Sequence, residues 1–218
     1  MNEGLNKLIH AYNECDKNNR SLSDGEFKEI APLLTKEDLE SLVTIESWSN
    51  NKMKEFVVPA IQLLCTRTVL LGLVDKEIIS TKALETERPW EINRSQTNQT
   101  GRTALHMLAE AGFLNKVIEK ATLEGLFKTM DSSDSSPLSI YFKECALTEK
   151  KVPEEIWKRL EELKWSKENL QRECIMTKFP LPNHCLVIIK ESRIRLEKIK
   201  EKKRKKFKLK TEEGINLG

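Results

Sequence analysis

The stretch "TGRTALHMLAEAG", residues 100–112, decides how this chain is expected to fold. It places a glycine and a threonine before an apolar segment that contains a histidine, and it ends at a second glycine. A threonine at the N-cap accepts a hydrogen bond from a backbone N–H of the first helical turn. Proline or alanine after it costs nothing, because that N–H has no helical partner. The pattern predicts a short helix that begins after Thr103.

A similar pattern recurs 33 residues later. When "NQTGRTALHML" (98–108) is laid over "DSSDSSPLSIY" (131–141), Thr103 meets Ser136 and Leu105 meets Leu138. Each copy has a polar turn, a hydroxyl residue, alanine or proline, and then leucine. A fixed period of this length is typical of repeat proteins, in which each copy is one helical unit of a stack.

Three further segments read Ser/Thr-x-Glu-x-Leu, at 35–39, 122–126 and 166–170. Each combines an N-cap residue with an acid in the first turn, where the helix dipole favours negative charge. The chain is therefore expected to be a series of helix pairs joined by short capped loops.

The period and the motif resemble those of the ankyrin repeat family. A second, weaker copy is followed by a third, "KFPLPNHCLVII" (178–189), which needs an insertion. The resemblance implies that Thr103 and His106 are scaffold residues that tie the turn to the helix, and that His106 is not catalytic. The residues that carry it are Gly101, Thr103, Leu105, His106, Ala109, Gly112, Pro137 and Leu138.

Composition favours an all-α protein. Charged residues make up 33% of the 218 residues, aromatic residues 6%, and the eight glycines argue against an architecture rich in strands and turns. We expect an N-terminal helical region (1–87), degenerate ankyrin-like repeats (88–190) and a basic C-terminal helix or tail (191–218). The apolar run 56–74 contains Arg67, which is costly in a bilayer, so it predicts a buried helix or helix pair and no transmembrane segment.

No catalytic, cofactor or metal site is predicted. The five cysteines show no C-x-x-C spacing, and Cys174, His184 and Cys185 fit no standard zinc spacing. Residues 16–27 resemble a calcium loop, but Arg20 stands at a ligand position and Glu26 falls one position short. The alternative for that stretch is a helical hairpin whose second helix starts with a capping box from Ser23 to Glu26.

Charge is unevenly distributed along the chain. The net charge is +3, yet residues 190–210 hold twelve Lys or Arg and three Glu, a local charge of +9. This tail is a candidate nuclear-import signal, a polyanion-binding patch for nucleic acid or anionic lipid, or a solvated helix end. The residues of its basic patch are Lys202, Lys203, Arg204, Lys205 and Lys206.

These features predict a non-enzymatic module that binds another protein, since stacked helix pairs expose extended surfaces. The alternatives are a nucleic-acid-binding or nuclear-targeted protein that acts through the basic tail, and an enzyme with an unrecognised helical active site. The opening "MNEGLNKLIH" lacks a secretory leader, so we expect a cytoplasmic or nuclear protein. Isolated repeats in a Lys-, Glu- and Asn-rich chain also resemble those of effectors from intracellular bacteria, which implies delivery into a host cell.

Overall fold

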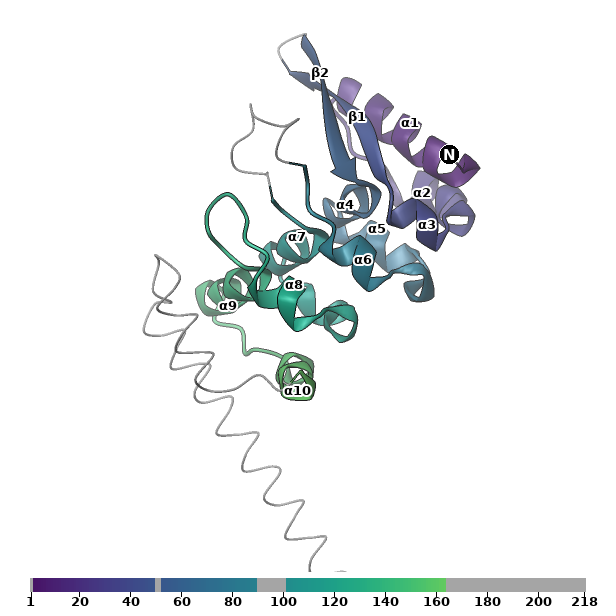
Figure 1. Ribbon diagram of the computed structural model, residues 1–218. Coiled ribbons are helices and arrows are strands. Elements are labelled where there is room, and N and C mark those ends of the chain that lie inside the picture. Colours follow the sequence, from purple (N-terminus) through teal and green to yellow (C-terminus); the bar gives the residue numbers. More distant parts are fainter. Residues whose placement is uncertain (1, 50–51, 90–100, 164–218) are drawn as a thin grey trace, which may run out of the picture.

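The computed structural model describes residues 2–49, 52–89 and 101–163. Figure 1 shows its elements following one another from α1 and a β-hairpin at one end to α10 at the other. The elements, in chain order, are α1 (Glu3–Lys17), α2 (Asp24–Ile30), η1 (Ala31–Leu33), α3 (Lys36–Leu39), β1 (Leu42–Ser49), β2 (Lys52–Pro59), α4 (Ala60–Cys65), α5 (Thr68–Leu73), η2 (Lys76–Ile78), α6 (Thr81–Glu85), α7 (Ala104–Glu110), η3 (Leu114–Lys116), η4 (Ile118–Lys120), α8 (Leu123–Phe127), α9 (Pro137–Leu147) and α10 (Glu154–Glu162), where η marks a 3₁₀-helix.

The prediction of an all-α fold is wrong, because β1 and β2 form a two-stranded antiparallel sheet. Leu42 lies opposite Pro59 at its base and Trp48 opposite Met53 near its tip. Val43 and Ile45 are buried, while the alternate residues Leu42 and Trp48 are exposed. This period of two is the signature of a strand with one covered face.

The apolar run 56–74, predicted to be a buried helix or helix pair, is only partly helical. Its first residues complete β2, and only the remainder is helical, as the pair α4 and α5. A β-branched segment, Val57–Val58, followed by Pro59 favours an extended chain up to the proline.

Helix α1 lies along the outer edge of β1. The Asn13 side chain accepts a hydrogen bond from the backbone N–H of Glu46 at 3.0 Å, and Asp16 accepts one from that of Trp48 at 2.6 Å. Edge strands carry N–H groups that would otherwise pair with another chain. The polar face of α1 therefore covers this edge.

The stretch 16–27 forms the turn between α1 and α2. Ser23 is the N-cap of α2 and forms a capping box with Glu26, which confirms the predicted helical hairpin. The guanidinium of Arg20 donates to both carboxylate oxygens of Glu26, at 2.9 and 3.0 Å. That bond, with those from Ser23, lowers the pKa of Glu26 to about 2.

Three helices recur at the centre of the fold. Helices α4, α7 and α9 begin at residues 60, 104 and 137, at intervals of 44 and 33 residues. Helix α7 contacts both α4 and α9, so the three helices stack in sequence order. One buried apolar cluster extends through all of them, from Leu5 in α1 to Leu160 in α10.

Helix α10 closes the described part of this cluster. Trp157 is buried and its ring stacks on Phe142 of α9, with centroids 5.7 Å apart. The Arg159 guanidinium donates to the carbonyl oxygen of Ala121 at 2.9 Å, which ties α10 to the turn before α8. Trp157 thus belongs to the core, as its position in an amphipathic segment indicates.

Candidate functional site

The two nitrogens of the buried His106 ring connect two helices. Thr103 is the N-cap of α7, and His106 Nδ1 accepts from its backbone N–H at 3.1 Å and lies 2.8 Å from its Oγ1. Because Nδ1 is an acceptor, the ring hydrogen resides on Nε2, which donates to the Ser135 carbonyl oxygen at 3.1 Å. Ser135 lies just before α9, so one imidazole joins the start of α7 to the start of the next helix in the stack.

The His106 ring is a neutral scaffold group. Burial lowers its pKa to about 4, although the charge of Asp131 and the bond to Ser135 act in the opposite direction. Its exposed fraction is 0% and both nitrogens have protein partners. A ring in this state has no nitrogen available to a substrate.

The loop before α9 is shaped to present the Ser135 carbonyl. One carboxylate oxygen of Asp131 accepts from the backbone N–H groups of Ser133 and Ser135, at 2.8 and 3.1 Å. The next residue, Ser136, accepts from the N–H of Ser139 at 3.3 Å and so acts as an N-cap. Pro137 and the buried Leu138 then open α9.

The two glycines of the first motif have the backbone conformation that glycine favours. Gly101 has φ of 72° and Gly112 has φ of 76°, both in the left-handed region. Gly112 follows the end of α7, and Phe113 N–H then donates back to the Leu108 carbonyl at 2.7 Å. The pair therefore marks the turns that enter and leave α7.

A second bridging side chain, Gln62 of α4, was not predicted from the sequence. It is 1% exposed, and its Nε2 donates to the Arg102 carbonyl oxygen at 2.8 Å. Arg102 lies just before Thr103, as Ser135 lies just before Ser136. Gln62 and His106 thus occupy the third position of α4 and α7, and each bonds the carbonyl that precedes the next helix start. A shift of 44 residues, which lays "AIQLL" (60–64) over "ALHML" (104–108), would have found it.

Gln62 also organises a short stem at its other end. Its Oε1 accepts from Arg88 Nε at 3.0 Å. The Arg88 N–H donates to the Arg102 carbonyl at 3.0 Å, and the Gly101 N–H donates to the Arg88 carbonyl at 3.2 Å. Arg88 and Arg102 are therefore fixed side by side by backbone bonds and by one buried amide.

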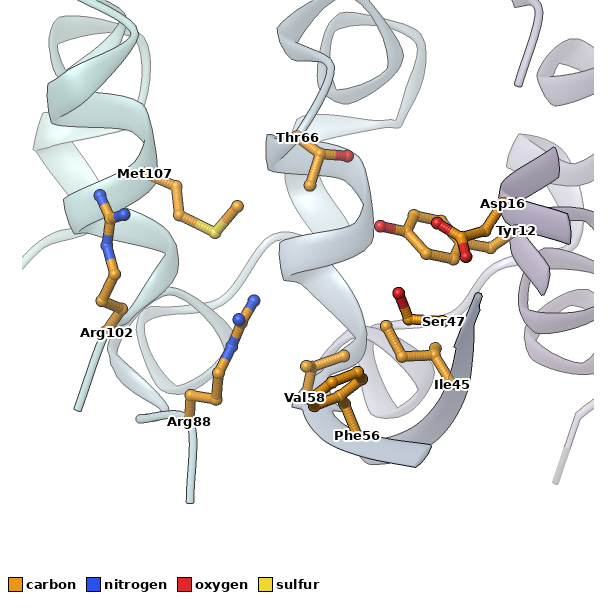
Figure 2. A pocket seen from close by; sticks show the side chains of 10 residues that line it. All are labelled: Tyr12, Asp16, Ile45, Ser47, Phe56, Val58, Thr66, Arg88, Arg102 and Met107. Carbon is orange, nitrogen blue, oxygen red and sulfur yellow. The ribbon is translucent and has the colours of Figure 1, made fainter. Parts of the chain in front are cut away.

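This stem borders a cavity of about 250 Å³ between α1, the hairpin, α4 and α7. Figure 2 shows Arg88, Arg102 and Met107 on one side of it, and Tyr12 and Asp16 on the other. The hairpin contributes apolar side chains and one hydroxyl. The complete lining is Tyr12, Asp16, Ile45, Ser47, Phe56, Val58, Thr66, Arg88, Arg102 and Met107.

The two sides of the cavity carry opposite charges. Burial lowers the pKa of Arg88, and the neighbouring charge of Arg102 lowers it further, while Tyr12 acts in the opposite direction. Arginine remains a cation at neutral pH despite such a shift. On the other side, burial raises the pKa of Tyr12, and the carboxylate of Asp16 adds to that increase. One side of the cavity carries the two guanidinium groups, and the other carries the Asp16 carboxylate and the Tyr12 hydroxyl.

Arg102 is only partly neutralised. One of its terminal nitrogens lies 2.5 Å from a carboxylate oxygen of Glu110, which is 61% exposed. Its Nε is buried and has no hydrogen-bond partner within the described segments of the chain. A buried donor without a partner costs free energy.

The remaining predicted residues divide into two groups. Leu105 and Ala109 are fully buried on the core side of α7. The third motif copy at 178–189 and the basic patch at 202–206 lie outside the described residues.

The described cysteines, Cys15, Cys65 and Cys145, are buried thiols, and burial raises the pKa of Cys65 to about 12. Such thiols are poor nucleophiles.

The described residues hold neither a candidate metal site nor a candidate membrane-spanning helix. Over residues 2–49, 52–89 and 101–163, no group of three or more His, Cys, Asp or Glu side chains is placed to hold a metal ion. In that same part of the chain, no helix has the length and apolar character needed to cross a membrane.

Comparisons with known proteins found no matching family model, no matching curated protein and no matching solved structure.

Proposed function

We propose that this chain is a non-enzymatic protein–protein interaction module built on ankyrin-like helix pairs. The observation that supports it is the repeated bridge in which Gln62 and His106 each bond the carbonyl before the next helix start. Recurrence of one contact at successive steps is a feature of repeat proteins, in which each unit contacts its neighbours. Such a scaffold keeps its shape from buried side chains and leaves its outer residues available for a partner.

Exposed apolar side chains indicate where a partner could bind. Trp48 and Met53 face each other across the hairpin and are 39% and 45% exposed. Phe113, after α7, is 40% exposed, and Leu147, at the end of α9, is 62% exposed. Large apolar and aromatic side chains contribute most of the free energy at protein interfaces. One pair of such side chains lies on the hairpin, and the other two lie after α7 and at the end of α9.

The test is affinity capture with the whole chain as bait, followed by quantitative mass spectrometry. Three baits are compared: the wild type, the hairpin double variant Trp48→Ser/Met53→Ser, and the stack double variant Phe113→Ser/Leu147→Ser. A partner should be retained by the wild type and by one double variant, and lost at least tenfold with the other. Purified partner and chain should then form a complex of fixed stoichiometry.

The melting temperatures of both double variants provide the control, since all four side chains are exposed and should change it little. If every captured protein binds the three baits equally, the interaction function is wrong for these surfaces. Turnover of a small molecule by the purified chain, lost in a cavity variant, would favour an enzyme instead.

A further inference from the structure

We propose that the cavity between α1, the hairpin and the Arg88–Arg102 stem binds a carboxylate carried on a short apolar group. The carboxylate would lie against the two arginines, and the apolar group against the floor of the cavity. This inference does not depend on whether the stack also binds a protein partner.

The cationic side of the cavity is preorganised. Gln62 is held in the core and bonds both the Arg88 side chain and the Arg102 backbone. The two backbone bonds of the stem fix the Cα positions from which both guanidinium groups extend. A guanidinium presents a planar fork of donors that matches the two oxygens of a carboxylate. Fixing the fork before binding reduces the entropy that the ligand must overcome.

The charges favour one carboxylate over a doubly charged anion. Two guanidinium charges face the cavity, but Glu110 pairs with Arg102, and Asp16 lies on the opposite side. The Asp16 carboxylate would repel a second negative charge on the ligand. The guanidinium groups of Arg88 and Arg102 both line the cavity, where N–H groups of a guanidinium can donate to a carboxylate.

The floor of the cavity selects an apolar group beside that carboxylate. Ile45, Phe56 and Val58 from the hairpin and Met107 from α7 line it. A volume of about 250 Å³ is below the usual range for drug-sized ligands, so the ligand is small or is the end of a larger chain. A fully hydrated inorganic ion would leave these apolar side chains in contact with water.

The acidic side adds a second requirement. The Asp16 carboxylate already accepts from Trp48 N–H, and it has further lone pairs that can accept from a ligand. A hydroxyl or amine at the far end of the apolar group should therefore strengthen binding.

The experiment uses 3-phenylpropionate as the probe, with its amide as the uncharged control. Binding to the full chain is followed by isothermal titration and by the chemical shifts of residues 45–58. The acid should bind at least tenfold more tightly than the amide, and 3-(4-hydroxyphenyl)propionate should bind more tightly than either. Comparable affinity for acid and amide, or no binding of the acid to the folded chain at 10 mM, would overturn the proposal.

Two variants locate the site. Arg102→Gln removes the charge but not the backbone carbonyl that Gln62 uses, so the chain should stay folded and lose at least tenfold in affinity for the acid. Arg20→Gln is the matched control, because Arg20 also pairs with an exposed glutamate, outside the cavity. An equal loss in both variants would mean that the probe responds to net charge and not to this cavity.

Asp16→Asn tests the opposite side and remains informative if Arg102→Gln fails to fold. It keeps an oxygen acceptor for Trp48 N–H and removes the negative charge. Affinity for 3-phenylpropionate should rise, and the advantage of the hydroxylated acid should shrink. A fall in affinity for the simple acid would contradict the proposed orientation.

A final pair of probes distinguishes a small molecule from a protein terminus as the source of the carboxylate. The peptide acetyl-Gly-Gly-Phe is compared as the free acid and as the amide. Tighter binding of the peptide acid than of 3-phenylpropionate assigns the site to a chain terminus. Weaker binding of the peptide acid than of 3-phenylpropionate assigns the site to a small carboxylate. In both cases the peptide acid should bind more tightly than the peptide amide.

Discussion

At the scale of single residues, the ring of His106 holds two helices only while it is neutral. Protonation would place a hydrogen on Nδ1, which now accepts from the Thr103 N–H. The bond to the helix start would then become a clash between two donors. The low pKa of this ring is therefore coupled to the stability of the stack.

The His106 ring should make the stability of the fold depend on pH. The pKa of His106 is lowered from 6.5 to about 4 in the folded chain, so the unfolded chain takes up a proton first as the pH falls. The contribution is complete above pH 6.5 and is lost progressively towards pH 4. Since one pKa unit corresponds to about 1.4 kcal/mol, the loss is about 3 kcal/mol.

Urea unfolding at pH 7 and pH 4.5 measures this loss against His106→Gln, which cannot titrate. The difference in unfolding free energy between wild type and variant should shrink at the lower pH. His10→Gln, at an exposed position of α1, is the control and should follow the wild type. A constant difference between wild type and His106→Gln at the two pH values would disprove the coupling.

At the scale of elements, the hairpin shows what local sequence could not reveal. Val43 and Ile45 alternate with polar or exposed residues, but the segment is short and few glycines accompany it. Its outer edge is stabilised by Asn13 and Asp16, about 30 positions earlier in the chain. A strand whose edge is satisfied by a distant helix depends on tertiary contacts, which composition does not report.

Helix α7 was predictable because its signals are local. Thr103, the adjacent alanine and Gly112 specify a start and an end within a few residues. Gln62 was not recognised because α4 starts after Pro59, without a hydroxyl N-cap. The cavity was not predictable either, since Tyr12 and Arg102 are 90 positions apart and meet only in the folded chain.

Helix α7 should tolerate little loss of volume. Leu105 is 0% exposed, so Leu105→Ala removes buried methyl groups and should cost about 2 to 5 kcal/mol of unfolding free energy. Leu147→Ala is the matched control, because Leu147 is 62% exposed, and it should change stability by about 0.5 kcal/mol or less. Equal urea midpoints for the two variants would place Leu105 outside the core.

At the scale of the whole molecule, buried contacts join residues on both sides of position 88. The core cluster continues from α6 into α7, and the first bridge, from Gln62, begins before residue 88. The 44-residue interval between α4 and α7 exceeds the next interval by 11 residues, and residues 90–100 lie within it. An insertion of this size hides the period from a search at a fixed shift of 33.

The basic tail stays a prediction from sequence. Nine Lys or Arg and one Glu lie between Lys198 and Lys210. Replacing residues 202–206 by glutamine should redistribute a fluorescent fusion in a eukaryotic cell if the tail is an import signal. If it binds a polyanion, affinity for DNA or anionic vesicles should fall steeply with salt. A chain that changes neither location nor polyanion affinity would leave the tail as a solvated helix end.

The most direct test of the stacked architecture is native-state hydrogen exchange on His106→Ala, with His10→Ala as the control. If successive units are joined by the Gln62 and His106 bridges, removing the second bridge should release the distal units first. Amides of α9 and α10 should then exchange at least tenfold faster than in the wild type, while those of α1, β1 and β2 change little. A uniform acceleration in every element, or unchanged exchange in α9, would contradict a stack held together at these two bridges.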